Sequence, residues 1–92
     1  MADGKDALSD ITREEAQAAL DNPETGSLRV LKQVGKLRDL YAKELASGKR
    51  RLEARNPVEE VAAEAAARDF TELARAEGKD GPSGITIARV GF

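Results

Sequence analysis

Apolar residues recur at helical spacing over residues 27–55, the longest such stretch of the chain. At about 100° per residue, they spread over more than half of the helix circumference. A helix that packs against a single neighbour needs an apolar stripe of only about 100°. The pattern therefore predicts a long central helix with neighbours on two sides. Its large apolar residues are Leu28, Val30, Leu31, Val34, Leu37, Leu40, Tyr41, Leu45 and Leu52.

Two ends of this helix are compatible with the sequence. Ser47 and Gly48 have the composition of a C-terminal cap, because glycine readily takes the left-handed conformation that ends a helix. Alternatively the helix continues to Arg55, since Leu52 keeps the apolar phase of the preceding turns. We favour continuation to Arg55.

Two shorter helices are predicted on either side of the central one. A capping box that begins at Thr12 starts a helix over residues 13–20. Asn56 is a favourable N-cap residue, and Pro57 occupies the first helical position of a helix over residues 57–76. The apolar side of this last helix is rich in alanine, which favours close approach to a neighbouring helix.

Only the carboxyl-terminal segment has the pattern of a β-strand. Ile85 and Ile87 would lie on one face of this strand, and Val90 and Phe92 on the other. The sequence suggests no second strand, and a lone strand leaves its backbone donors and acceptors unpaired. We therefore expect this strand to pair with another chain.

Length and composition predict one small, mostly α-helical domain. We divide the 92 residues into an N-terminal arm (1–11), a helical region with three helices (12–78), and a hinge with the C-terminal strand (79–92). Sixteen of the 37 hydrophobic residues are alanine, so the core is thin. Oligomerisation or docking on a larger partner would compensate for such a core.

Cys and His, which are common in catalytic and zinc sites, are both missing from the sequence. Without Cys or His, the chain has no thiol nucleophile, no imidazole base and no structural zinc site of the usual type. No Gly-rich phosphate loop of the usual spacing is found. We expect a non-enzymatic protein that uses no cofactor and no metal.

Charge is distributed unevenly along the chain despite a net charge of −2. Residues 28–55 have nine basic and three acidic side chains, whereas the segments before and after them are acidic. Basic side chains on one helix face can follow a phosphate backbone, but here the low pI and the scarcity of aromatic residues favour a solvated or protein-facing role. Polyanion binding is therefore the alternative function. The residues that would carry it are Lys36, Lys43, Lys49, Arg50, Arg51 and Arg55.

One pair of opposite charges stands out on the helical wheels. Arg38 falls within the apolar side of the central helix, and Asp69 within that of the following helix. If these two sides pack together, the charges must pair or be stranded at high cost. We predict a partly buried ion pair that sets the register of the two helices.

The main functional prediction concerns the strand that contains Ile85, Ile87, Val90 and Phe92. An extended segment can join the sheet of a partner through backbone hydrogen bonds; alternatively, it can fold back over the helices as a strap. In build, the small, alanine-rich helical chain with two extended arms resembles virion components such as phage head or head–tail joining proteins. We predict a structural or adaptor subunit, homo-oligomeric or part of a larger assembly, with a nucleic-acid-binding or regulatory protein as the alternative.

No apolar run is long enough to span a membrane, and no secretory signal is visible. The expected location is the cytoplasm or a virion or other assembly, without secretion or membrane contact.

Overall fold

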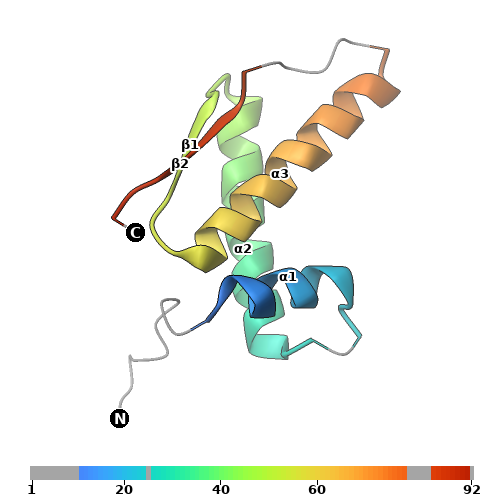
Figure 1. The fold of residues 1–92 in the computed structure, drawn as a ribbon. Coiled ribbons are helices and arrows are strands. Elements are labelled where there is room, and N and C mark those ends of the chain that lie inside the picture. The colour runs from blue at the N-terminus through green and yellow to red at the C-terminus, as the bar shows by residue number, and fades with distance from the viewer. Residues whose placement is uncertain (1–10, 25, 79–83, 92) are drawn as a thin grey trace.

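Three helices and two short strands make up the part of the chain that the computed structural model describes, residues 11–24, 26–78 and 84–91. Residues 1–10 of the predicted N-terminal arm, most of the hinge and Phe92 lie outside these residues. Helices α2 and α3 cross, α1 lies over the N-terminal ends of both, and the strands run side by side next to α3 (Figure 1). The predicted mostly helical domain with three helices is confirmed. The elements are α1 (Arg13–Asp21), α2 (Leu28–Ala46), β1 (Arg51–Ala54), α3 (Pro57–Ala76) and β2 (Thr86–Arg89).

Helices α1 and α3 begin where their capping residues predict. The Thr12 hydroxyl accepts a hydrogen bond from the Glu15 backbone N–H, and the Glu15 carboxylate accepts one from the Thr12 N–H. The Asn56 side chain accepts from the N–H of Glu59 at 2.9 Å. Each cap satisfies a backbone donor that the first helical turn leaves unpaired. Local sequence is thus sufficient to place these two starts.

The predicted continuation of the central helix to Arg55 is wrong. Gly48 takes a left-handed conformation with φ of 105°, and its N–H donates to the carbonyl of Leu45. The N–H of Lys49 donates to the carbonyl of Glu44. These two bonds form a Schellman motif, which satisfies the last carbonyls of α2 and turns the chain away from the helix axis.

The expectation that the C-terminal strand has no pairing partner in its own chain is also wrong. β2 pairs with β1 in parallel, with Leu52 opposite Ile87. The sequence pattern does not reveal β1, because the strand has only four residues. Its apolar Leu52 also fits the helical spacing of the preceding apolar residues. Its exposed side chains are Arg51 and Glu53, and its buried ones are Leu52 and Ala54.

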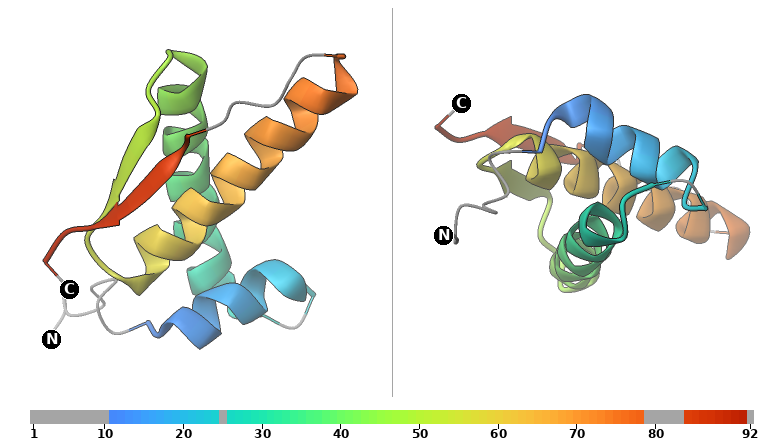
Figure 2. Two further views of the ribbon diagram at one scale, coloured as in Figure 1. Left: turned by 45° about the horizontal axis from the view of Figure 1, so that its top comes forward. Right: turned by 90° about the horizontal axis from the view of Figure 1, so that it is seen from below.

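Helix α3 is the centre of the packing. It contacts α1, α2, β1 and β2 and forms the connection between the two parallel strands (Figure 2). Seven of its residues are buried, four of them alanine, so neighbouring backbones approach it closely. The largest fully buried side chains of the described core are Leu45, Leu52, Val34, Val58 and Val61. Among the described residues, none of the helices is long and apolar enough to cross a membrane.

Candidate functional site

Tyr41 of α2 reaches the outer edge of β1. The hydroxyl of Tyr41 donates a hydrogen bond of 2.6 Å to the backbone carbonyl of Glu53, which faces away from β2. Burial raises the pKa of Tyr41 to about 12, so this hydroxyl remains a donor at neutral pH. From below, β1 lies between β2 and α2 (Figure 2, right). A strand added at this edge would have to displace the Tyr41 hydroxyl from the Glu53 carbonyl.

Replacing Tyr41 by phenylalanine is expected to lower the free energy of unfolding by about 1 kcal/mol, because the Glu53 carbonyl loses the donor that the buried Tyr41 side chain supplies. Urea denaturation followed by circular dichroism measures the change. Thr71→Val is a matched control, since the Thr71 hydroxyl bonds only to the Ala67 carbonyl of its own helix. Equal stabilities of Tyr41→Phe and the wild type would contradict the role of this hydroxyl.

The outer edge of β2 is not paired with a strand in the part of the chain that the structure describes. The N–H groups of Thr86 and Val90 donate to the carbonyls of Arg50 and Ala54, at 2.8 Å each. Alternate residues of β2 therefore face β1, and Ile87 directs its own N–H and carbonyl to the other side. Neither group has a hydrogen-bond partner within residues 11–24, 26–78 and 84–91. Such an edge is a template for pairing with another chain.

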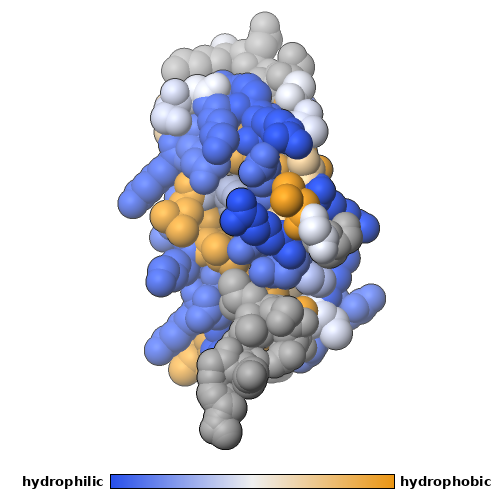
Figure 3. All heavy atoms as spheres, turned by 90° about the vertical axis from the view of Figure 1, so that its left-hand side faces the viewer, coloured by the Kyte–Doolittle hydropathy of each residue, from blue (hydrophilic) through white to orange (hydrophobic). Residues whose placement is uncertain are grey.

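The side chains of β2 and of the residues on either side of it divide between the two faces of the sheet. Ile85 and Ile87 are half-buried against the core of the chain, as the strap interpretation expected. Val90 is also half-buried. Because side chains alternate along a strand, it points to the face opposite that of Ile85 and Ile87. The side of the molecule on which the strands lie is mostly hydrophilic, with smaller hydrophobic patches (Figure 3). The partner-binding potential of β2 therefore resides in its backbone edge more than in a hydrophobic face.

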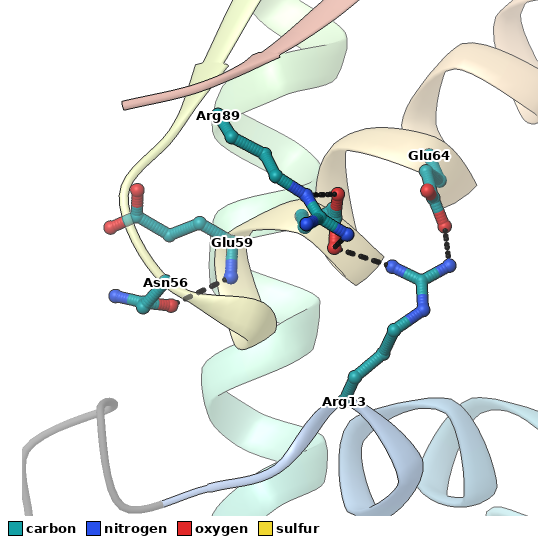
Figure 4. A network of polar contacts seen from close by, with 6 residues as sticks. Arg13, Asn56, Glu59, Glu64 and Arg89 are labelled. Atoms are coloured by element: carbon teal, nitrogen blue, oxygen red, sulfur yellow. Dashed lines mark hydrogen bonds and ion pairs between the residues drawn. The ribbon is translucent and has the colours of Figure 1, made fainter. Parts of the chain in front are cut away.

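A charge network anchors β2 and α1 on α3 (Figure 4). Glu60 is 7% exposed and is the one buried charged residue among those described. Its carboxylate accepts from the Arg89 Nε and from Arg13, each at 2.7 Å, and Arg13 also donates to Glu64 at 2.6 Å. The hydrogen bond from Arg89 is the main cause that lowers the pKa of Glu60, and the bond to Glu64 raises the pKa of Arg13.

The composition of this network indicates that it stabilises the fold and does not bind a ligand. Two arginines face two glutamates, so the cluster carries no net charge with which to attract a ligand. Sequence reasoning missed it because Arg13 and Arg89 are 47 and 29 residues from Glu60, and no local periodicity reports such distances. Only the packing of α1 and β2 against α3 brings the four side chains together.

Arg38 and Asp69 do form an ion pair between α2 and α3. Their side chains are 40% and 44% exposed, so the pair lies at the rim of the helix contact. It borders an apolar groove of about 570 Å³ between the diverging helices, with Ala42, Ala66 and Leu73 among the lining residues. The two charges neutralise each other at this rim.

The basic residues proposed for polyanion binding are spread over several elements. Lys49 pairs with Glu44, and Arg51 with Glu53. Arg50 donates to the Leu45 carbonyl and lies 5.3 Å from the centre of the Phe70 ring, which gives it a structural role. The remaining three are exposed: Lys36, Lys43 and Arg55. Half of the set is thus engaged within the chain, and polyanion binding stays a prediction.

Comparison of the chain with protein-family models, curated proteins and solved structures gives no match. Within the described part of the chain, no group of three or more acidic side chains is placed to hold a metal ion. The open edge of β2 is therefore the candidate functional site, on the geometry of the chain itself.

Proposed function

We propose that this protein is a non-enzymatic structural or adaptor subunit of a larger protein assembly, and that a partner chain adds a strand to the outer edge of β2. The observation that carries the proposal is the backbone of Ile87, whose N–H and carbonyl point away from β1 and have no partner among the described residues. Backbone pairing supplies affinity in this mode of recognition, and flanking side chains supply specificity.

The size of the sheet supports the proposal. Each strand has four residues and the two are parallel, a pairing that is less stable per residue than an antiparallel one. Two-stranded sheets are marginal without further packing. A third strand would give β2 a hydrogen-bonded neighbour on both sides. We predict that this neighbour is found in a virion or a similar assembly.

Replacing Ile87 by proline tests the edge. Proline removes the outward N–H but leaves the donors of Thr86 and Val90 that pair with β1. We expect assembly to weaken about tenfold or more, the effect of losing about 1.4 kcal/mol of binding free energy. Size-exclusion chromatography with light scattering over a concentration series measures the mass relative to the 9.9 kDa monomer.

Ile87→Val is the matched control, because it retains the N–H and most of the side chain. Circular dichroism of both variants checks that the fold is retained. Equal assembly of the proline and valine variants would show that the edge is not used. Running the same columns with DNA at low and high salt addresses the alternative: a monomer with salt-sensitive DNA binding would favour a role for Lys36, Lys43 and the neighbouring basic residues.

A further inference from the structure

A groove lies between the start of β2 and the exposed side of α3. It has a volume of about 410 Å³ and is lined from α3 by Ala67, Arg68, Thr71 and Arg75, from β2 by Ile87, and by Ile85 just before this strand. Because Ile87 belongs both to the groove and to the open edge, a strand added to β2 would lie directly over this groove.

The floor of the groove is apolar and suits apolar side chains of small to medium size. Ala67, Ile85 and Ile87 are half-buried and pack against the core, and the Thr71 hydroxyl is already bonded to the Ala67 carbonyl. Successive side chains of an extended segment point to opposite faces. Every second side chain of an added strand would therefore enter the groove, where a volume of this size accepts one or two side chains.

Two arginines lie on the α3 side of the groove. Arg68 and Arg75 are exposed and form no ion pair or hydrogen bond within the described residues. By contrast, Arg13, Arg38 and Arg89 each pair with a carboxylate. Glu72 also lines the groove, so two positive charges face one negative charge and the groove has a net charge of +1.

The spacing of the two arginines suits an extended ligand. Seven residues of helix separate them, about 10 Å along the axis of α3. An extended chain covers this distance in about three residues. Two carboxylates on neighbouring or alternate positions of one strand could therefore approach both guanidinium groups. Nucleic acid is disfavoured, because none of the groove-lining residues is aromatic and could stack on a base.

On the basis of the proposed strand addition, we propose that the groove binds an extended acidic segment of a protein partner. The backbone of this segment pairs with Ile87, an apolar side chain covers Ala67 and Ile85, and its carboxylates pair with Arg68 and Arg75. Charge complementarity thus selects the partner, and the backbone edge of β2 holds it.

A short blocked peptide that alternates valine and glutamate is the probe, labelled for fluorescence anisotropy and titrated with the full chain at low salt. Two otherwise identical peptides, called the glutamine twin and the lysine twin, carry glutamine or lysine in place of glutamate. We expect the glutamate peptide to bind about fivefold to tenfold more tightly than the glutamine twin, the effect of two exposed ion pairs. The double variant Arg68→Glu, Arg75→Glu should reverse the preference in favour of the lysine twin.

Lys36→Glu, Lys43→Glu is the matched control, because it makes the same change in net charge on exposed residues outside the groove. Unchanged preference in this variant supports the groove, and a reversal there as well would overturn it. If the glutamate and glutamine peptides bind equally well to the wild type and neither binds to Ile87→Pro, the acidic preference is overturned but strand addition is supported. Failure of all peptides to bind, or binding that persists in Ile87→Pro, would overturn both. Displacement of the peptide by a single-stranded oligonucleotide at equal or lower concentration would also overturn the assignment to a protein segment.

Discussion

Replacing Leu52 by alanine is expected to lower the free energy of unfolding by about 3 kcal/mol. The Leu52 side chain is fully buried at 0% exposure and belongs to the core that β1 shares with α3. Truncation of a buried leucine costs the transfer free energy of the removed methyl groups plus the cost of the cavity, about 2–5 kcal/mol in total. For a small domain this is a large part of the total stability.

Leu40→Ala is the control, because Leu40 is a leucine of α2 with 48% exposure. Its substitution should change stability by no more than about 0.5 kcal/mol. Urea denaturation of both variants, followed by circular dichroism, measures the difference. Equal effects of the two substitutions would contradict the burial of Leu52 beneath the sheet, and with it the position of β1.

The second large effect is a loss of stability in acid that depends on Glu60. The pKa of Glu60 in the folded chain lies below its ordinary value of 4.5. Folding is therefore favoured by ionised Glu60 at all pH values above about 4.5. This contribution is lost progressively as the pH falls from the ordinary pKa through the lowered pKa of the folded state.

Glu60→Gln should reproduce this loss at neutral pH. Glutamine retains the shape but removes the charge that Arg13 and Arg89 contact, so we expect the free energy of unfolding at pH 7 to fall by about 2 kcal/mol. The difference from the wild type should shrink as the pH is lowered towards 3, because the wild-type carboxyl then becomes neutral as well. Urea titrations at several pH values measure both effects.

Glu72→Gln provides the comparison for this experiment, since Glu72 is exposed and has no ion pair or hydrogen bond within the described residues. It should leave stability and its pH dependence close to those of the wild type. If the deficit of Glu60→Gln were the same at pH 3 and pH 7, ionisation of Glu60 would not be the source of the stabilisation.

The helix starts were predictable because their signals are local. Thr12 and Asn56 each bond to a backbone N–H three residues later, so their effect depends on no distant part of the chain. Arg38 and Asp69 could be paired from the wheels alone, since both positions follow from helical periodicity once the two helices are assumed to pack. In these cases short-range geometry and the apolar pattern suffice.

The end of the central helix shows where such reasoning fails. Leu52 fits the apolar phase of a continuing helix as well as the alternation of a strand, so periodicity cannot separate the two structures over four residues. The choice depends on Gly48, whose left-handed conformation closes α2, and on the presence of β2 as a parallel partner. That partner lies 35 positions further along the chain, where no local pattern registers it.

The sequence by itself determined a small, mostly helical domain with a thin core, the starts of α1 and α3, and the extended character of the C-terminal segment, because these follow from composition and from contacts within a few residues. Only the tertiary structure decided that β2 pairs with β1, that Tyr41 binds the outer edge of β1, and that Glu60 joins α1 to β2. Each of these depends on groups far apart in the chain, which meet only when α3 carries the backbone from one strand to the other. The same crossover leaves the backbone N–H and carbonyl of Ile87 without a partner among the described residues, beside Arg68 and Arg75.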